Sequence, residues 1–298
     1  MIPPIARRFV AGESAAEALE HARQCNGDGI AAVLALAGEH NDRAGARADT
    51  TAYLDLIDDL AATDLDASLS VTPTQIGLDV SPELFERNYR RIVTYADRRG
   101  AFVWCETTDA PTTETTVDVF EELASEFPWR SGIHLRSRLK RTREDLSRLV
   151  DVPGSIRIGK GPAGTSSTSG RSDASATVAY ADPVRADEAF RGDVEHLFEH
   201  RDRGVAVGSH DPEILSLATR LGDEFDTDYE IQLPMGVRPD AQRDLAAQGI
   251  TVSQYVPYGD AWLSYLSRRV GEYGGILPFA VRVIAGRYSR RSRSLADT

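Results

Sequence analysis

The chain has 298 residues and a formal net charge of −12, because 46 Asp and Glu residues outnumber 34 Lys and Arg residues. This length suits one large barrel-type domain or two small ones, and the acidic balance argues against a general nucleic-acid binder, which carries a basic stripe. Neither an apolar run of about 18 residues nor a signal peptide is present, so we expect a cytoplasmic protein without a transmembrane helix.

The chain begins with a predicted helix at residues 14–24, and short apolar segments typical of buried strands then alternate with amphipathic helical segments. The eight strand segments are 29–38, 67–71, 101–105, 132–135, 155–159, 204–208, 229–233 and 250–257. The helical segments that follow the leading helix are 51–62, 81–99, 114–127, 140–150, 186–201, 212–225, 240–249 and 260–270. Cys105 lies in the third strand segment and is predicted to be a small core residue, since two cysteines make no disulfide framework.

This alternation predicts parallel strands, and the number of strands predicts a closed, TIM-type (βα)8 barrel of the α/β class. An open doubly wound sheet is the alternative. Connections are short and there is no linker, so residues 1–298 are expected to form one domain. The exception is residues 161–176, a Gly/Ser/Thr-rich loop after the fifth strand. In a barrel such a loop lies on the active face, so it is a candidate lid or else a flexible insertion without a role.

Two motif matches are not expected to carry function. GKGPAG (159–164) fits the dinucleotide fingerprint G-x-G-x-x-G, but the Ser, Thr and Gly residues that follow do not begin the helix that such a site needs. HLFEH (196–200) fits an inverted zinc motif on a charged helix outside the barrel, where a catalytic zinc would lack support. We therefore predict a solvated helical face there and no metal site.

Polar residues gather where the predicted strands end, which is the active face of a barrel. They are Thr72, Glu106, Arg136, Arg157, Lys160, Ser209, His210, Gln232 and Tyr255. A core-only barrel does not need an arginine and a lysine flanking one strand end. The set therefore predicts a site for an anionic or phosphorylated cofactor, with a structural ion-pair layer at the rim as the alternative.

The last predicted helix carries an adjacent arginine pair, Arg268 and Arg269. Asp260 is expected to cap its N-terminus, and an apolar face is expected from its helical spacing. Two guanidinium groups at one place suit a carboxylate or phosphate, whereas a solvated face with Arg268 paired to Glu272 is the alternative. The residues of the apolar face are Trp262, Leu263, Leu266 and Val270.

Several of these blocks, in this order, resemble the proline dehydrogenase family in its monofunctional bacterial and archaeal form. The blocks are TPTQIGLDVS (72–81), GIHLRSRLKRTREDL (132–146), SIRIGKG (155–161), VGSHDPEIL (207–215), YEIQLPMGVRP (229–239) and YVPYGDAWLSYLSRRVGE (255–272). The resemblance implies a distorted (βα)8 barrel whose last helix sits over the active face. It also implies an FAD-dependent enzyme that oxidises L-proline to 1-pyrroline-5-carboxylate, with hydride passing from proline C5 to flavin N5 and electrons passing on to quinone or another acceptor.

The resemblance also implies roles for individual residues. Arg268 and Arg269 would bind the proline carboxylate, with Thr72 at the substrate, and Glu106 and Tyr255 would be catalytic. The residues implied to contact FAD are Arg136, Arg157, Lys160, Gly161, Ser209, His210, Gln232 and Glu272. A pyrroline-5-carboxylate dehydrogenase is implied as a partner, and contact with a quinone implies a peripheral position at the inner face of the membrane.

The sequence departs from the family pattern at four positions. Thr72 stands where the family has an active-site lysine, and Glu106 stands where it has an aspartate. Ala163 replaces a tyrosine and Arg136 replaces a flavin-contacting glutamine. These departures concern substrate preference more than fold or flavin binding. The alternatives are therefore a flavin oxidoreductase of a related imino or N-substituted amino acid, and a flavin-binding or ligand-binding protein without catalysis.

Overall fold

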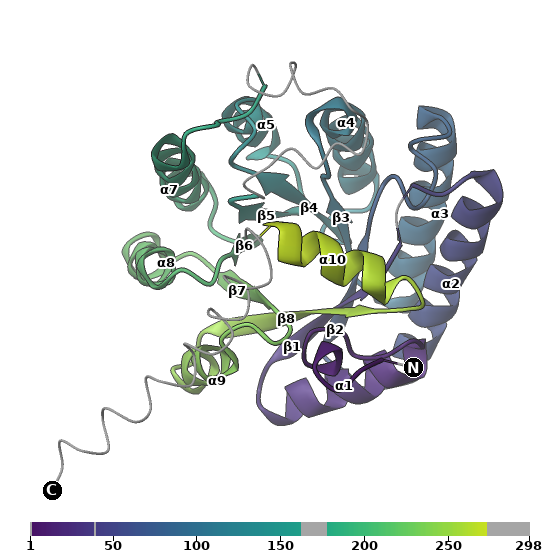
Figure 1. Cartoon of the computed structure of the whole chain (residues 1–298). Helices are drawn as coiled ribbons and strands as arrows, with labels where there is room; N and C mark the ends of the chain where they lie inside the picture. The colour runs from purple at the N-terminus through teal and green to yellow at the C-terminus, as the bar shows by residue number, and fades with distance from the viewer. Residues whose placement is uncertain (1, 39, 162–177, 273–298) are drawn as a thin grey trace, which may run out of the picture.

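A computed structural model describes residues 2–38, 40–161 and 178–272 of the chain. Eight parallel strands pair in sequence order and close into a barrel, with β8 hydrogen-bonded to β1 (Figure 1). The prediction of a closed (βα)8 barrel is therefore confirmed, and the open sheet is not formed. The strands are β1 (Ala31–Leu36), β2 (Ala67–Val71), β3 (Val103–Glu106), β4 (Ser131–Arg136), β5 (Ser155–Gly159), β6 (Val205–Gly208), β7 (Tyr229–Pro234) and β8 (Thr251–Tyr258).

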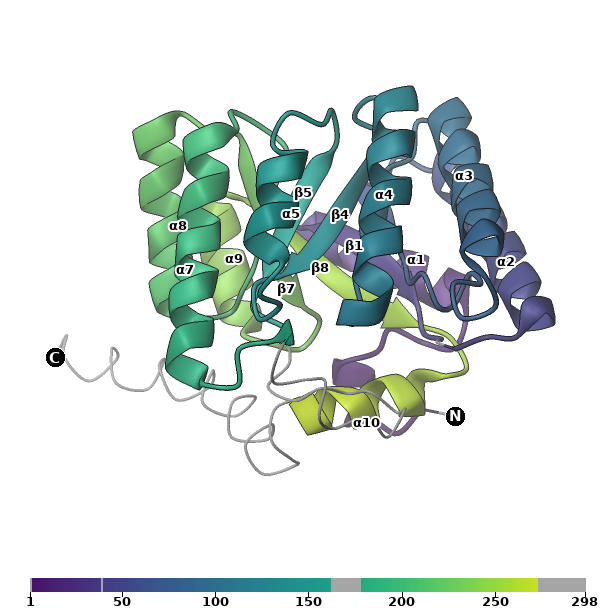
Figure 2. The ribbon, with the colours of Figure 1, turned by 90° about the horizontal axis from the view of Figure 1, so that it is seen from above.

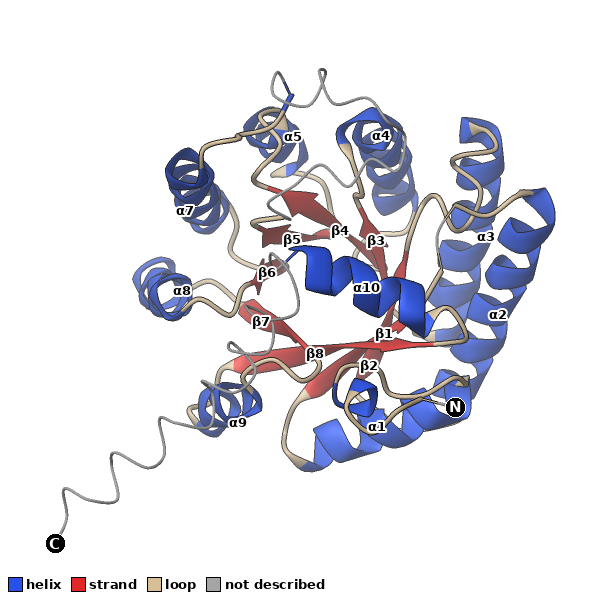
Figure 3. Cartoon of the chain, in the orientation of Figure 1, coloured by secondary structure: helices blue, strands red, loops and turns tan. Residues whose placement is uncertain are grey.

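Helices form an outer ring around these strands (Figure 3). Most of them begin where a Ser or Asp side chain accepts a hydrogen bond from a backbone N–H of the first turn, which satisfies a donor that the helix itself leaves unpaired. The helices are α1 (Ala15–Gly27), α2 (Arg43–Ala61), α3 (Pro82–Arg99), α4 (Ala110–Glu126), α5 (Thr142–Leu149), α7 (Pro183–His200), α8 (Pro212–Phe225), α9 (Pro239–Ala247) and α10 (Trp262–Glu272), with a short 3-10 turn η1 (Ala6–Arg8) before them.

Alternate residues of each strand face opposite sides of the barrel wall, as strand geometry requires. Most outward residues are apolar and pack against the helices, for example Leu34 on β1, Ile133 on β4 and Ile156 on β5, all fully buried. Cys105 belongs to this layer, which confirms its predicted place in the core. The main hydrophobic core therefore lies between wall and helices, and the inward positions carry polar residues together with a small apolar cluster of Val33, Trp104 and Ala206.

Helix α10 does not join the outer ring but lies across the carboxyl ends of the strands, which we call the mouth of the barrel (Figure 2). It packs there on the N-terminal segment, since Tyr265 forms one apolar cluster with Ile2, Ala6, Phe9 and Val10. The predicted position of the last helix over the active face is thus confirmed. None of the helices among the described residues is long and apolar enough to cross a membrane.

Two expectations for α10 are wrong in detail. Leu263 was expected on the apolar face but is 63 % exposed, and Tyr265 is buried instead. The reason is that the buried face is set by contact with the N-terminal segment, a partner that helical spacing does not identify. The helix begins at Trp262, so Ala261 rather than Asp260 immediately precedes it, and Asp260 is exposed. The side chain of Val270 and the loop 162–177, which includes most of the candidate lid, lie outside the described residues.

Candidate active site

The inward residues of five neighbouring strands form a polar rung across the barrel. Strand pairing places them in register, and we call this set the central rung: Glu106, His134, Arg157, Ala206 and Glu230. Two residues further along the strands, towards the mouth, lies a second set that we call the upper rung: Arg136, Gly159, Gly208 and Gln232.

The carboxylate of Glu106 is buried at the end of β3, and protein donors contact both of its oxygens. Oε1 accepts a hydrogen bond of 2.5 Å from the Ser70 hydroxyl and a very short one from Arg157. Oε2 lies 2.6 Å from Nδ1 of His134. Charge-assisted bonds of this kind are the strong ones, so the carboxylate is held firmly within the central rung.

Arg157 is the centre of this arrangement, with a side chain only 3 % exposed. Its guanidinium donates to Glu106 on one side and, at 2.6 Å, to the Gln232 amide oxygen on the other. It also lies over two rings, 5.1 Å from the Trp104 centroid and 5.7 Å from that of Tyr255. A planar cation stacks on aromatic faces while its edge donates hydrogen bonds, which explains how a full charge is tolerated here.

The network continues from Arg157 to β7 and β8 through neutral groups. The Gln232 side-chain amide donates a 2.8 Å bond to Glu230, and the Ser253 hydroxyl donates to the other oxygen of the same carboxylate. The inward polar side chains of β2, β3, β4, β5, β7 and β8 are therefore joined by one chain of contacts. The network lies inside the barrel as well as at its rim, and its assignment to a cofactor site rather than to a structural ion-pair layer stays a prediction.

The ionisable groups of the network have pKa values that are shifted in different directions. Burial raises the pKa of Glu106, but Arg157, His134 and the Ser70 hydroxyl outweigh it and hold that pKa well below its usual range. Burial, together with the Arg157 charge, lowers the pKa of His134 to about 4, although Glu106 acts in the opposite direction. Burial raises the pKa of Glu230, whose hydrogen-bond donors among the described residues are the neutral Ser253 hydroxyl and Gln232 amide.

At the mouth, the predicted site residues of the loops surround this network. Thr72 follows β2, is half-buried, and its carbonyl accepts a 3.1 Å bond from the Gln75 N–H. Ser209 is buried directly after β6, where its hydroxyl accepts from the Asp211 N–H at 3.2 Å. His210 follows it and its carbonyl accepts a 2.6 Å bond from Arg238. The fold thus brings these residues to the same end of the barrel.

The end of β5 carries the remaining predicted cations. Lys160 is 37 % exposed and forms an ion pair with Asp187 of α7. Gly161 has a φ of +83°, a conformation that L side chains rarely adopt, and a Cβ there would lie 3.2 Å from the Cβ of Arg136. Arg136 and Lys160 therefore lie at the ends of neighbouring strands on one side of the mouth, and Arg157 lies deeper on the central rung, paired with Glu106.

This side of the mouth has features that a flavin nucleotide requires. Gly159 and Gly208 pair in register on β5 and β6. The His134 ring lies beside Gly159, whereas the atoms nearest to a Cβ at Gly208 would be the Ile158 carbonyl oxygen at 3.4 Å and the Arg157 Cγ at 3.8 Å. The nearby cations and the Gln232 and Ser209 side chains suit anionic and hydrogen-bonding groups. The residues present therefore fit an FAD-like cofactor, which carries a flat ring and a diphosphate.

Tyr255 connects the barrel interior to the helix across the mouth. Its half-buried ring packs against Trp104 in the barrel and against the Tyr265 cluster beneath α10. Arg268, Arg269 and Glu272 belong to α10 by backbone position, but their side chains lie outside the described residues. The structure therefore brings the helix of the arginine pair to the mouth, while the predicted carboxylate contact stays a prediction.

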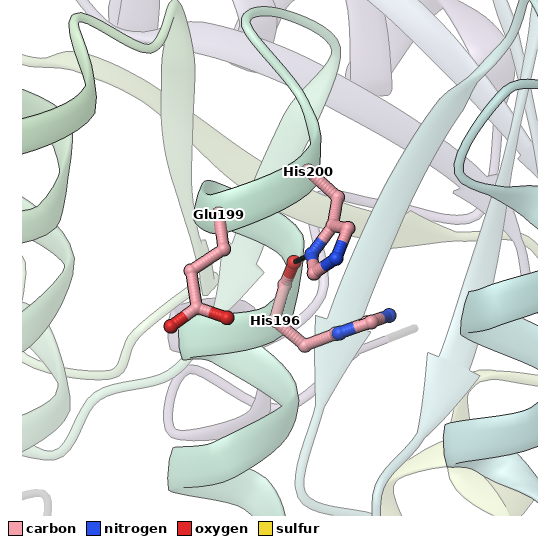
Figure 4. A group of neighbouring side chains, drawn as sticks. All are labelled: His196, Glu199 and His200. Carbon is pink, nitrogen blue, oxygen red and sulfur yellow. Dashed lines mark hydrogen bonds between the residues drawn. The ribbon is translucent and has the colours of Figure 1, made fainter.

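The HLFEH motif lies away from the mouth, in the last turns of α7 (Figure 4). Glu199 and His200 are exposed and His196 is half-buried, and one ligand atom from each lies within 4.8 Å of the others. His200 donates from Nδ1 to the His196 carbonyl at 2.8 Å. The helix position agrees with the prediction of a mostly solvated face that takes no part in the barrel site.

Sequence reasoning missed several members of the network because it collected only residues at strand ends. A signal was present, since each missed residue is polar or aromatic at an inward position of a strand whose outward positions are mostly apolar. The missed residues are Ser70, Trp104, His134, Glu230 and Ser253.

Known proteins match this chain over most of its length. A family model described as Proline dehydrogenase matches residues 18–281. Proline dehydrogenase of Deinococcus radiodurans is 32% identical over 288 residues, covering 90% of this chain and 86% of the relative. Proline dehydrogenase 1 of Bacillus subtilis subsp. natto is 29% identical over 286 residues, covering 94% of this chain and 90% of the relative.

Solved structures of proline utilization A (PutA) share the fold. The Bdellovibrio bacteriovorus protein superposes with a TM-score of 0.78 at 19% identity, over 89% of this chain. The Corynebacterium freiburgense protein gives a TM-score of 0.76 at 20% identity, over 97% of this chain. This chain spans only about a third of those longer chains, 32% and 33%. The match over residues 18–281 and the 32% identity to the Deinococcus radiodurans protein show that the chain belongs to the proline dehydrogenase family.

Proposed function

We propose that this protein oxidises L-proline to 1-pyrroline-5-carboxylate with a non-covalently bound FAD, and passes the electrons to a quinone or another acceptor. The observation that carries the proposal is the buried Arg157 network beneath a cation-rich mouth, in a chain of the proline dehydrogenase family. Bound FAD supplies the two-electron acceptor that amine oxidation requires. The protein residues bind and orient the substrate and the cofactor, and they exclude water from them.

The described contacts support a division of labour among the residues. Arg157 is fixed by Glu106, Gln232 and two rings, so it is a rigid positive charge under the mouth. We assign Arg157 and Lys160 to the flavin, where a nearby cation favours the electron-rich reduced form. Thr72, Tyr255, Arg268 and Arg269 are assigned to the substrate. Arg136, Gly161, Ser209, His210, Gln232 and Glu272 are assigned to the cofactor.

Glu106 is expected to be catalytic, and its contacts suggest a more specific role for it. Both carboxylate oxygens already accept from side chains of the protein. We therefore propose that Glu106 acts on the reaction by holding Arg157, whereas Tyr255 lies at the substrate. A quinone acceptor would bring the protein to the membrane surface, and a pyrroline-5-carboxylate dehydrogenase would consume the product.

Spectroscopy of the purified protein tests the proposed function. We expect flavin absorbance that bleaches when L-proline is added anaerobically, and flavin that is fully released by acid or heat. Bleaching by an N-substituted or another imino acid but not by L-proline would move the substrate to a related compound. A flavin spectrum that no such compound bleaches would indicate binding without catalysis, and absence of flavin would overturn the cofactor.

Substitution of Arg269 tests the proposed substrate clamp. Losing one charge-assisted bond to a carboxylate removes on the order of 1.5–3 kcal/mol, so Arg269→Met should raise the KM for proline roughly tenfold to a hundredfold. FAD content and melting temperature should stay near the wild-type values. Arg269→Lys is the matched control, and it should recover only part of the affinity because lysine lacks the planar fork. Unchanged binding of tetrahydrofuran-2-carboxylate by Arg268→Met/Arg269→Met would contradict the clamp.

A further inference from the structure

His134 is a buried histidine that the proposed function does not yet use. It faces inward on β4 and lies in register between Glu106 and Arg157 on the central rung. Its side chain is 18 % exposed, and its Nδ1 lies 2.6 Å from Glu106 Oε2. The carboxylate therefore has a donor from each of three strands: Ser70 on β2, His134 on β4 and Arg157 on β5.

The protonation state of His134 follows from these contacts. Glu106 is ionised between its donors, and an ionised carboxylate only accepts hydrogen bonds, so Nδ1 of His134 carries the proton. Burial and the positive charge of Arg157 lower the pKa of the imidazole, so the ring is neutral near pH 7. A neutral ring with its proton on Nδ1 leaves Nε2 unprotonated.

Space for the imidazole is provided by a glycine of the neighbouring strand. A Cβ added to Gly159 would lie 2.7 Å from His134 Nε2, closer than real Cβ contacts allow. Gly159 belongs to the upper rung, immediately before Lys160. His134 and Gly159 are therefore a matched pair, in which the absence of a side chain on β5 admits the ring on β4.

We propose that His134 is a positioning residue for the proposed proline oxidation: its Nδ1–H holds the Glu106 carboxylate in the orientation that fixes Arg157 beneath the mouth. Glu106 offers Oε1 to Arg157 and Ser70, and the bond to Oε2 opposes rotation of the carboxylate away from them. Without that bond, Oε2 is a buried acceptor with its donor removed, and such a group is costly. The inference rests on the proposed function for its kinetic consequences, but not for its electrostatic ones.

The kinetic test compares His134→Leu with His134→Asn in the full-length protein with FAD bound. Leucine removes the donor, whereas the asparagine side-chain nitrogen occupies nearly the same place as Nδ1 and can donate to Oε2. We expect His134→Leu to lower kcat for L-proline roughly tenfold to a hundredfold, the range for a lost bond to a charged group. KM and FAD content should change little, and His134→Asn should recover most of kcat.

The pH profile supplies a readout that simple loss of packing would not move. Among the described residues, the charged or titratable groups that interact with Glu106 or His134 are Arg157 of β5, Arg136 of β4, Cys105 of β3 and Tyr53 of α2. The His134 bond favours the ionised carboxylate, so its removal makes Glu106 easier to protonate. The acid limb of kcat should therefore move to higher pH in His134→Leu and stay near the wild-type position in His134→Asn.

A measurement without substrate separates this proposal from the proposed function. The protonated-carboxyl infrared band that disappears in Glu106→Gln reports Glu106 alone, and it should appear at higher pH in His134→Leu than in wild type. If L-proline does not reduce the flavin but this band moves, the proposed function fails and the positioning stands. If the band and kcat of His134→Leu both match wild type, or if His134→Asn is as impaired as His134→Leu, the positioning is overturned.

A double substitution tests the matched pair. Gly159→Ala alone places a Cβ against Nε2, so we expect lower melting temperature and displaced Glu106, seen as the same shift of the carboxyl band. In His134→Val/Gly159→Ala the added methyl group meets a smaller side chain, and the melting temperature should exceed that of Gly159→Ala. If the changes in melting temperature of the single variants His134→Val and Gly159→Ala simply add in the double variant, the pairing of His134 with Gly159 is contradicted.

Discussion

Glu106 and Glu230 lie on the same rung of the barrel and on opposite sides of Arg157, yet the protein treats them in opposite ways. Glu106 is the more buried of the two, and burial by itself disfavours a charged carboxylate. Its pKa is nevertheless held well below the usual range, whereas that of the partly buried Glu230 is raised. If burial alone set the pKa values, Glu106 would have the higher pKa of the two, which is the opposite of what the contacts produce.

The difference lies in the kind of partner that each carboxylate contacts. Arg157 donates directly to Glu106, but it reaches Glu230 only through the Gln232 amide. The donors to Glu230 are the Ser253 hydroxyl and that amide, both neutral. Neutral donors offset only part of the loss of water, while a cation in contact reverses it. The barrel interior thus contains the Glu106–Arg157 ion pair on one side of Arg157 and, on the other side, the Glu230 carboxylate with its neutral donors.

The largest expected effect comes from removing the cation that creates this difference. Arg157→Met leaves Glu106 buried without its charge partner, and breaking such a pair costs about 3–5 kcal/mol of unfolding free energy. Flavin reduction should also become less favourable because a positive charge beneath the mouth is lost. Urea unfolding and the flavin midpoint potential measure the two effects.

Two further variants make the Arg157 result specific. Adding Glu106→Gln to Arg157→Met removes the orphaned charge, so part of the stability should return. Arg191→Met removes an exposed pair with Glu213 on the outer helices, with side chains 49% and 79% exposed, and should cost no more than about 1 kcal/mol. Equal losses for Arg157→Met and Arg191→Met would mean that the interior pair has no special weight.

The architecture of the barrel could be predicted from the sequence, because strand and helix periodicities are local. Leu34 and Ile156 lie in short apolar runs bounded by turns, and helices begin at residues such as Ser81 and Asp211 that cap them. Residues at or just after strand ends, such as Arg136 and Ser209, could be chosen for the same reason, whereas Arg157 lies in the middle of β5. Parallel strands bring their carboxyl ends to one face whatever the details of packing.

The contacts inside the barrel could not be predicted, because they depend on register. His134 and Glu230 are polar residues at inward positions of β4 and β7, and nothing local says which residue each of them meets across the barrel. That choice follows from how the strands are staggered on closure. The burial of Tyr265 in place of Leu263 has a similar cause, since the N-terminal segment that covers α10 is more than 250 residues away in sequence.

A smaller loss of unfolding free energy is expected when the Glu106 carboxylate itself is replaced by a neutral amide. Glu106→Gln keeps an oxygen that accepts from Arg157 but loses the charge, which should cost about 1.5–3 kcal/mol near neutral pH. The pKa of Glu106 is lowered from 4.5 in the folded state, so its contribution is fully present above pH 4.5 and is lost as pH falls through the folded value. The stability curves of wild type and variant should therefore converge in acid. Parallel curves at every pH would show that the Arg157 contact does not depend on the charge.

The smallest effect, with the opposite sign, is expected for Glu230→Gln. The pKa of Glu230 is raised above 4.5 in the folded state, so the folded protein holds a proton that the unfolded chain releases. Its contribution is fully present below pH 4.5 and is lost as pH rises through the folded value. Glutamine resembles the protonated form and can still accept from Gln232, so the variant should be equal to or slightly more stable than wild type near pH 7, and should lose that advantage in acid. Urea unfolding over the same pH series measures this. A loss at pH 7 as large as that of Glu106→Gln would mean that the neutral donors Ser253 and Gln232 stabilise the charged carboxylate as well as an arginine does, and the contrast between the two glutamates would not hold.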